Sequence, residues 1–148
     1  MPQVAKIDNE APSFDLPYYD PITDNDWNIS QSELDWKWSV LFYYPADFTF
    51  VCPTELKDMA ESKDIFNELW VEVLAASTDT VFSHRAWVKN EKLMEWFPYK
   101  MLSDHNLEVA DIYNILDEDS VRKSHELTHE VHSQVQLLYL SSVLWSTP

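Results

Sequence analysis

Two continuous apolar runs place the strongest constraint on the fold of this chain. Residues 38–44 (WSVLFYY) and 71–77 (VEVLAAS) each have the length of a strand and together contain only one charged residue. Strands that are buried on both faces, as in parallel sheets, have near-continuous apolar sequences of this kind. We therefore predict that both runs form central strands of one sheet.

The segment after each run has the spacing of a helix. Apolar residues recur every three to four positions through 53–69, and Pro53 suits a first helical position. Residues 80–96 show the same spacing. The further expected elements are an extended segment at 12–20, a short strand at 101–104, a helix at 107–115 capped by Asn106, and a last strand at 135–140.

Strands that alternate with helices predict an α/β fold with a partly parallel sheet. A chain of 148 residues is long enough for one domain with a core and too short for two. Its composition, 45% apolar and 14% aromatic, is that of a globular rather than a disordered protein. We expect a single domain over residues 1–148.

The charge balance argues against two classes of partner. A formal net charge of -16 repels nucleic acid and anionic membranes. No apolar segment of the secretory type opens the chain, and the apolar run 135–145 is broken by serines and is too short to span a bilayer. The single cysteine cannot form an internal disulfide, which agrees with a reducing compartment. These features together predict a cytoplasmic protein.

The single cysteine, Cys52, lies where the expected strand 38–44 leads into the expected helix 53–69. Unpaired N–H groups and the helix dipole at such a position favour a thiolate over a thiol. Thr49 is placed to donate a hydroxyl hydrogen bond to the sulfur or to a bound oxygen, while Pro45 stiffens the turn. A guarded thiolate with a nearby donor suits attack on a peroxide O–O bond, which yields a sulfenic acid. The alternative is a buried cysteine that packs as a small apolar side chain.

A family resemblance favours the reactive thiol. Pro45, Thr49 and Cys52 spell P-x-x-x-T-x-x-C within the stretch YPADFTFVCPTEL, and the chain resembles the peroxiredoxins of the alkyl hydroperoxide reductase and thiol-specific antioxidant type. The similarity covers most of the chain. It continues through VLAASTDTVFSHRAW (73–87), MLSDHNLEVADIYNILDED (101–119) and VQLLYLSSVLWSTP (135–148).

The resemblance implies a thioredoxin-like fold, with a central mixed sheet flanked by helices. It also implies reduction of hydrogen peroxide and organic hydroperoxides without a metal or an organic cofactor. The reductant would be an external thiol, from a thioredoxin-like protein or a dedicated reductase, and the protein would form a homodimer or a larger homo-oligomer. Neither nucleic acid nor a membrane is expected as a partner.

The same resemblance implies a role for each residue of the signature. Cys52 is the peroxidatic nucleophile, Thr49 orients the peroxide, and Pro45 shields the pocket. Glu55 matches a family position that helps to hold the catalytic arginine.

The first departure from the family pattern concerns the second thiol. The resolving cysteine of the family lies beyond a C-terminal helix, whereas this chain ends at STP, where that helix would begin. We therefore expect a domain without the family's C-terminal segment. Its disulfide step would need an external thiol.

The second departure concerns the arginine. In the family this residue lies on a buried strand after LDEDS, but here the segment 121–134 reads VRKSHELTHEVHSQ. Counting forward from EDS or backward from QLLYL places Ser124, His125 or Glu126 near the arginine position. Arg122 can take that position only if the loop is shortened. We keep Arg122 as the candidate, with a catalytically impaired peroxiredoxin-like scaffold as the alternative function.

The segment HELTH is a rival motif. It matches H-E-x-x-H, in which His125 and His129 on one helix face share a zinc ion and Glu126 acts as general base, as in metalloproteases. His132 would be the third ligand. No acidic residue follows Glu130, and no glycine turn leads to a further histidine. We therefore predict a solvated patch without a metal, with zinc binding as the alternative.

The chain contains no glycine, although about ten are expected at average usage. Trp36, Trp70, Trp96 and Trp145 stand where members of the family commonly carry glycine. One recurring replacement suggests a UGA codon that means glycine in the source and is read here as tryptophan. If these turns require a positive φ, each tryptophan costs roughly 1 kcal/mol of backbone strain.

Four further side chains receive simpler interpretations. We expect His84 and His105 to be polar surface or loop residues, and Trp87 to belong to the core or to a dimer contact. Asp47 lies near Cys52, but a carboxylate there would disfavour the thiolate, so we do not assign it as a base.

Overall fold

The computed structural model describes Ala5 and residues 11–35, 37–44, 46–48, 52–113 and 136–141. For 52–54 and 136–141 it describes the backbone alone. None of the helices in these parts of the chain is long and apolar enough to cross a membrane.

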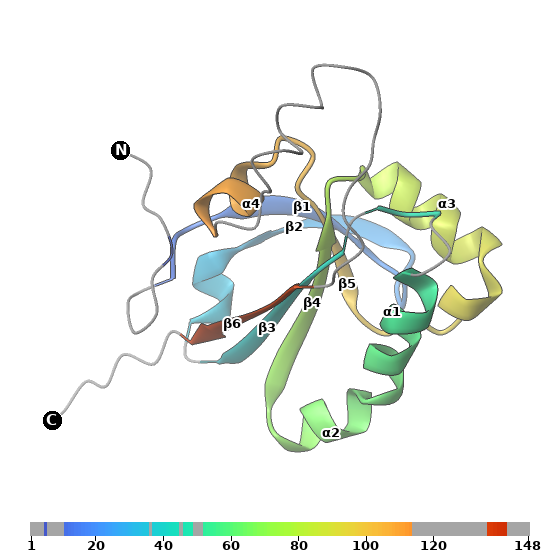
Figure 1. Cartoon of the computed structure of the whole chain (residues 1–148), viewed down its shortest axis with the longest axis horizontal. Coiled ribbons are helices and arrows are strands. Elements are labelled where there is room, and N and C mark those ends of the chain that lie inside the picture. Colours follow the sequence, from blue (N-terminus) through green and yellow to red (C-terminus); the bar gives the residue numbers. More distant parts are fainter. Residues whose placement is uncertain are drawn as a thin grey trace, which may run out of the picture.

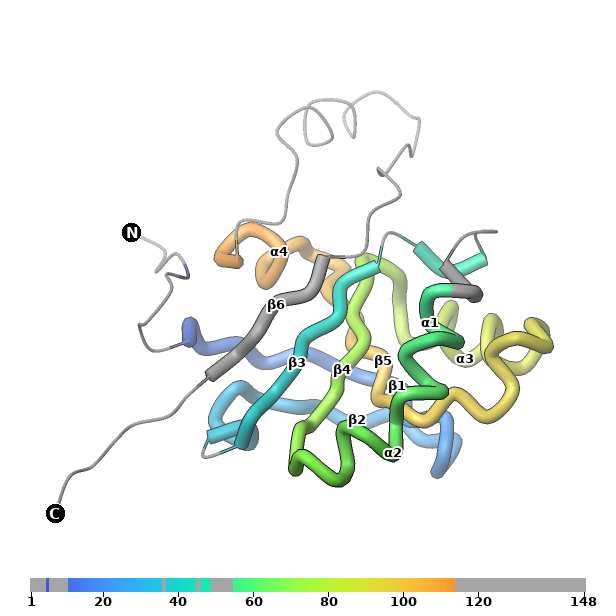
Figure 2. The backbone as a smooth tube through the Cα atoms, turned by 60° about the horizontal axis from the view of Figure 1, so that its bottom comes forward, coloured from blue at the N-terminus to red at the C-terminus, as the bar shows by residue number. Residues whose placement is uncertain are grey.

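Six strands form one mixed sheet at the centre of the molecule (Figure 1). They are β1 (Asp15–Asp20), β2 (Asn25–Ser30), β3 (Trp38–Tyr43), β4 (Val71–Ser77), β5 (Lys100–Ser103) and β6 (Gln136–Ser141). The order across the sheet is β2-β1-β5-β4-β3-β6. The central strands β5, β4 and β3 are parallel, while β1 and β6 run antiparallel to their neighbours. Figure 2 shows β3 and β4 side by side.

The apolar strands confirm the sequence prediction, and β2 was missed. The strands predicted at 38–44, 71–77, 101–104 and 135–140 each lie within one residue of the observed bounds. β2 escaped prediction because its sequence, NDWNIS, is mostly polar and only Ile29 is buried. It is held instead by antiparallel pairing with β1 along its whole length.

Helices cover both faces of the sheet (Figure 1). They are α1 (Cys52–Glu61), α2 (Lys63–Glu68), α3 (Val81–Asn90) and α4 (Glu108–Ile112), with 3₁₀ turns η1 (Gln31–Leu34) and η2 (Lys92–Met94). Side chains of α1 and α3 join the core on one face, whereas those of α4 join the core on the other.

The helix predicted at 53–69 is interrupted at Ser62, so it forms two helices. The Ser62 hydroxyl donates to the Asp58 carbonyl oxygen at 3.0 Å. The Ser62 N–H donates to the carbonyl oxygens of both Asp58 and Met59. A serine that bonds back to the preceding turn bends a helix, which accounts for the break between α1 and α2.

The helix predicted at 80–96 is shorter than expected. α3 ends at Asn90, because Glu91 has extended backbone angles. The Glu91 carboxylate then accepts the Leu93 N–H at 3.1 Å and caps η2. The apolar spacing of this segment therefore runs through a helix and a separate 3₁₀ turn.

The cap predicted for α4, Asn106, is wrong. The capping carboxylate is that of Asp104, which is buried directly after β5 and accepts the N–H groups of Val109 at 3.2 Å and Ala110 at 2.8 Å. Asp104 also accepts the Tyr43 hydroxyl at 2.8 Å. One carboxylate thus ties α4 to β3.

Alternate residues of the central strands face two separate cores. Val40 and Phe42 of β3 pack in the cluster that contains Leu56 of α1 and Trp87 of α3. Leu41, between them, packs in the opposite cluster, which contains residues of α4. The predicted core position of Trp87 is confirmed. Burial on both faces explains why the sequences of β3 and β4 are continuously apolar.

Candidate functional site

The carboxyl ends of β3, β4 and β5 lie at one edge of the sheet, because these strands are parallel. The chain leaves β3 at Tyr43 and enters α1 at Cys52. The predicted placement of Cys52 between a strand and a helix is therefore confirmed for its backbone. Open α/β sheets commonly bind ligands at this edge, outside the carboxyl ends of the strands.

The other residues of the predicted site are only partly described. Glu55 lies in the first turn of α1 and is partly buried. Pro45, Thr49 and Arg122 lie outside the described residues, as does the side chain of Cys52. The roles implied for all five residues therefore remain predictions.

The histidines of the rival motif also remain a prediction. His125, His129 and His132 lie outside the described residues. Among the residues that the structure does describe, no three histidine, cysteine, aspartate or glutamate side chains gather where they would hold a metal ion. His105 is exposed after β5, as predicted, and its Nδ1 lies 3.2 Å from the Thr78 carbonyl oxygen.

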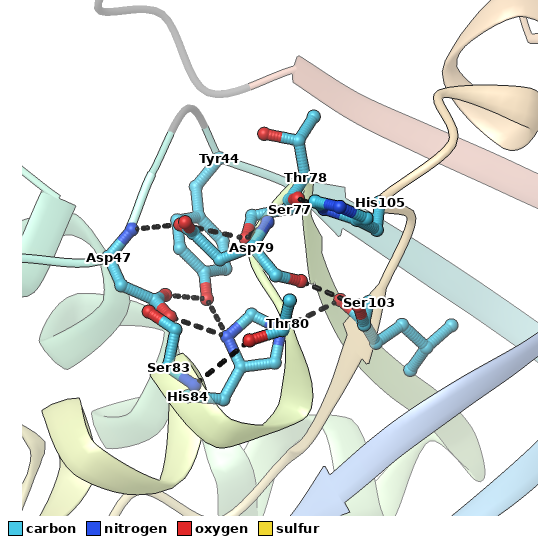
Figure 3. A network of polar contacts seen from close by, with 11 residues as sticks. Tyr44, Asp47, Ser77, Thr78, Asp79, Thr80, Ser83, His84, Ser103 and His105 are labelled. Carbon is cyan, nitrogen blue, oxygen red and sulfur yellow. Dashed lines mark hydrogen bonds and ion pairs between the residues drawn. The ribbon is translucent and has the colours of Figure 1, made fainter.

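The prediction for His84 was wrong, because this side chain of α3 is completely buried, with 0% exposed. Its Nδ1 lies 2.8 Å from Asp47 Oδ2 and 3.2 Å from the Tyr44 hydroxyl oxygen. Its Nε2 lies 3.0 Å from the Leu102 carbonyl oxygen in β5. The Tyr44 hydroxyl in turn donates to Asp47 Oδ1 at 2.6 Å. Figure 3 shows the side chains of Tyr44, Asp47 and His84 converging on one another.

The hydrogen bonds indicate where the protons of this cluster lie. The Leu102 carbonyl oxygen can only accept, so His84 Nε2 carries a proton. The Tyr44 hydroxyl donates its own proton to Asp47. A further proton must lie between His84 Nδ1 and Asp47 Oδ2, because two lone pairs would otherwise face each other at 2.8 Å. His84 and Asp47 therefore form a buried pair bridged by a proton.

Asp79 anchors the backbone of the same loop. Its Oδ2 accepts the Asp47 N–H at 2.6 Å, and its own N–H donates to Ser77 Oγ at 3.1 Å. Ser103 Oγ donates to the Asp79 carbonyl oxygen at 2.6 Å, which adds the end of β5 to the network (Figure 3). Burial raises the pKa of the Asp79 carboxyl, and the hydrogen bond from the Asp47 N–H opposes that rise. The loop that leads to Cys52 is thus tied to the ends of two neighbouring strands.

The two tyrosines at the end of β3 act as hydroxyl donors on opposite faces of the sheet. Burial, followed by the charge of the nearby Asp47, raises the pKa of Tyr44 well above the usual range. Burial and the charge of Asp104 raise the pKa of Tyr43 in the same way. Both hydroxyls therefore keep their protons at neutral pH and remain available to donate.

Phe48, directly after Asp47, has an unusual backbone conformation. Its φ of 59° lies in the left-handed region, which residues other than glycine avoid. The ring is exposed, and its centroid lies 6.3 Å from that of Trp87. A residue held in such a conformation persists only where the surrounding structure fixes it. The contacts of Asp47 fix the residue immediately before it.

Sequence reasoning considered Asp47 and His84 separately and missed the contact between them. The two residues are 37 positions apart, one in a loop and one in a helix, so no periodicity relates them. The available signal was their position within two of the stretches that carry the family resemblance, YPADF and STDTVFSHRAW.

Comparison with solved structures places the chain in a fold class. The crystal structure of Enterococcus faecalis AhpC is similar to it with a TM-score of 0.71 and 36% sequence identity, over 75% of this chain and 65% of that one. The reduced 2-Cys peroxiredoxin of Plasmodium vivax gives a TM-score of 0.72 and 30% identity, over 78% and 61% of the two chains. The chain is thus an α/β protein of the thioredoxin-like class, as predicted.

Sequence comparison narrows the class to a family. The AhpC/TSA family matches residues 7–136, and the chain belongs to this family. An alkyl hydroperoxide reductase C from Staphylococcus haemolyticus is 39% identical over 114 residues, which are 77% of this chain and 60% of that protein. A relative from Staphylococcus saprophyticus is 39% identical over 113 residues. The chain spans about 60% of the length of these curated relatives.

Proposed function

We propose that this chain is a thiol peroxidase, which reduces hydrogen peroxide and organic hydroperoxides through a sulfenic acid at Cys52. The position of the single cysteine carries the proposal. In a chain that belongs to the AhpC/TSA family, Cys52 is the first residue of α1, at the carboxyl edge of the parallel strands. The unpaired N–H groups at the start of a helix favour the thiolate that attack on a peroxide requires.

In the proposed reaction, the Cys52 thiolate attacks one oxygen of the peroxide. The S–O bond forms as the O–O bond breaks, and the leaving oxygen takes a proton and departs as water or an alcohol. The sulfur loses two electrons to become a sulfenic acid, and the peroxide gains them. Thr49 would orient the peroxide, Pro45 would shield the pocket, and Glu55 would hold an arginine, for which Arg122 is the candidate.

Return of the sulfenic acid to the thiol requires a second thiol. Because these 148 residues contain one cysteine, that thiol comes from outside them. We propose a thioredoxin-like protein or a dedicated reductase as its source. A cytoplasmic homodimer or larger homo-oligomer completes the proposal, and the net charge of -16 supports the absence of nucleic acid and membrane partners.

A trapping experiment tests the proposed function. Reduced protein is mixed with hydrogen peroxide, sulfenic acid is captured with dimedone at timed intervals, and the modified residue is located by peptide mass spectrometry. We expect Cys52 to be labelled at a rate many orders of magnitude above that of free cysteine. The Cys52→Ser variant should take up no label. A rate equal to that of free cysteine would contradict the proposal and would identify the catalytically impaired scaffold instead.

A further inference from the structure

We propose that the contact between Asp47 and His84 is a positioning device that sets the reactivity of the Cys52 thiol. Asp47 lies five residues before Cys52, in the loop that joins β3 to α1. His84 lies on α3, and its Nδ1 lies 2.8 Å from Asp47 Oδ2. The inference rests on the proposed thiol chemistry but can be tested apart from it.

The burial of this pair points to a role in geometry. The side chains of His84 and Asp47 are 0% and 1% exposed. Removing an ionisable pair from water carries a penalty that mutual attraction offsets only with good geometry and further hydrogen bonds. Apolar side chains of similar volume would fill the same space without that penalty. Because every side-chain polar atom of the pair has a partner, and so does the Asp47 N–H, the arrangement specifies one position of the loop.

The contact joins the loop to the centre of the sheet. The Leu102 carbonyl oxygen, in β5, holds His84 at Nε2, and His84 Nδ1 holds Asp47 Oδ2. Asp79, between β4 and α3, holds the Asp47 N–H at 2.6 Å. Both the side chain and the backbone of Asp47 are therefore fixed from outside the loop (Figure 3).

Asp47 directly precedes a residue in a strained backbone conformation. Phe48, the next residue, has a φ of 59°, so the chain turns sharply there. Under this proposal, releasing Asp47 allows Phe48 to leave its strained conformation, and the Cys52 backbone, four residues later, shifts with it. A misplacement of about 1 Å at a reacting group can lower a rate by about 100-fold.

Two substitutions at His84 separate positioning from simple burial. In His84→Asn, the amide nitrogen takes the place of Nδ1 and donates to Asp47, but no group reaches Leu102. In His84→Gln, the amide nitrogen takes the place of Nε2 and reaches Leu102, but no group donates to Asp47. Both variants lose the ring and both lower the stability. If His84 had only a structural role, Cys52 would react with hydrogen peroxide and with iodoacetamide at similar rates in the two variants.

Two rates are measured for the wild type and for both variants, with circular dichroism and urea unfolding as checks on folding. One is sulfenic acid formation with hydrogen peroxide, and the other is alkylation of Cys52 by iodoacetamide. We expect His84→Gln to lower the first by about 100-fold and the second by about tenfold, whereas His84→Asn keeps both within about threefold of the wild type. If His84→Gln does not fold, Asp47→Asn, whose amide can still form a hydrogen bond with His84 Nδ1, is compared with Asp47→Val, which cannot.

The outcomes distinguish this inference from the proposed function. Equal rates for the paired variants beside a fast wild type overturn the inference and leave the peroxidase function in place. A wild type no faster than free cysteine overturns the peroxidase function. In that case the alkylation rates still decide the inference: unequal rates support positioning, and equal rates overturn it as well.

Discussion

The two ends of the parallel strands differ in how the surrounding structure accommodates their side chains. At the carboxyl ends, buried polar groups of Tyr44, Asp47 and His84 all have hydrogen-bond partners. In the connections that lead into the amino ends, Trp70 and Trp96 have φ values of 57° and 72°, and both side chains are 88% exposed. Paired, buried polar groups at one end therefore contrast with large, exposed side chains in a left-handed conformation at the other, while Phe48 shares that conformation at the carboxyl end.

Trp70 occupies the position after a helix where glycine is favoured. α2 ends at Glu68, Leu69 follows, and Trp70 takes the left-handed conformation. Its N–H donates to the Asn67 carbonyl oxygen at 3.1 Å, as expected for this type of helix end. The hydrogen bond fixes the backbone conformation, so the large side chain adds strain without a packing contact that would offset it.

Trp96 repeats this arrangement after η2. Glu95 closes the 3₁₀ turn, and Trp96 follows it with a positive φ. The next N–H, that of Phe97, donates to the Met94 carbonyl oxygen at 3.0 Å. The glycine hypothesis requires a positive φ at each replaced position. Positions 70 and 96 meet this requirement. Trp36 and Trp145 lie outside the described residues.

The largest expected effect concerns the carboxyl end. Asp47→Ala leaves His84 and Tyr44 buried without their carboxylate partner, so we expect the free energy of unfolding to fall by about 3–5 kcal/mol. Urea unfolding followed by circular dichroism measures the change. Asp26→Ala is the control, because Asp26 pairs with Arg85 at 2.7 Å on the surface and should change the stability by less than about 1 kcal/mol. Equal losses in the two variants would contradict the importance of the buried pair.

The second largest expected effect is a rise in the free energy of unfolding, from substitutions at the amino end. Trp70→Gly and Trp96→Gly each relieve a left-handed backbone conformation, so each should raise the free energy of unfolding by about 1 kcal/mol. The two sites lie in separate connections, so the gains should add. Urea unfolding of both single variants and of the double variant provides the measurement.

Trp27→Gly is the matched control for this gain. Trp27 is also exposed, but it lies within the strand β2, where glycine weakens the structure by roughly 0.5–1 kcal/mol. A loss at Trp27 beside gains at Trp70 and Trp96 would support the glycine hypothesis. If neither variant gained stability, the glycine hypothesis would be wrong.

The smallest effect is spectroscopic and compares a tyrosine at each end. Burial raises the pKa of Tyr99, just before β5, from 10.0 to about 12, and burial with the charge of Asp47 raises the pKa of Tyr44 well above 10.0. Tyrosine ionisation is followed by absorbance at 295 nm as the pH is raised. Tyr99→Phe should therefore show one ionisation step fewer than the wild type near pH 12, whereas Tyr44→Phe should show the same steps as the wild type below that pH. A missing step in Tyr44→Phe would contradict the burial of its hydroxyl.

The shift at Tyr99 also affects stability, with a definite sign. The folded pKa is raised, so the contribution of Tyr99 is fully present below pH 10 and is lost as the pH rises through about 12. The stability difference between wild type and Tyr99→Phe should therefore shrink between about pH 10 and about pH 12. An unchanged difference would mean that Tyr99 ionises alike in both states.

The sequence predicted those parts of the fold that depend on local composition. β3 and β4 were predicted because each is a continuous apolar run, and the position of Cys52 followed from the strand and helix on either side. β2 was missed because its stability comes from pairing with β1 rather than from its own residues. The break at Ser62 was missed because one back-bonding hydroxyl does not disturb the apolar spacing.

The buried polar network was beyond prediction for a different reason. Its members come from a loop, the end of a strand and a helix, and the contact of His84 with Asp47 spans 37 positions of sequence. Such contacts are set by the packing of the whole sheet. The two strained tryptophans were anticipated because a glycine position is a local property of a turn, which the family resemblance carries.

The most direct test of the account is the rate of sulfenic acid formation at Cys52, measured in the wild type and in the double variant Trp70→Gly/Trp96→Gly. We predict that both rates lie far above that of free cysteine and agree within about twofold, because Trp70 and Trp96 lie at the opposite end of the strands from Cys52. A wild-type rate equal to that of free cysteine would contradict the account, since it would leave this member of the AhpC/TSA family with the fold and without the chemistry.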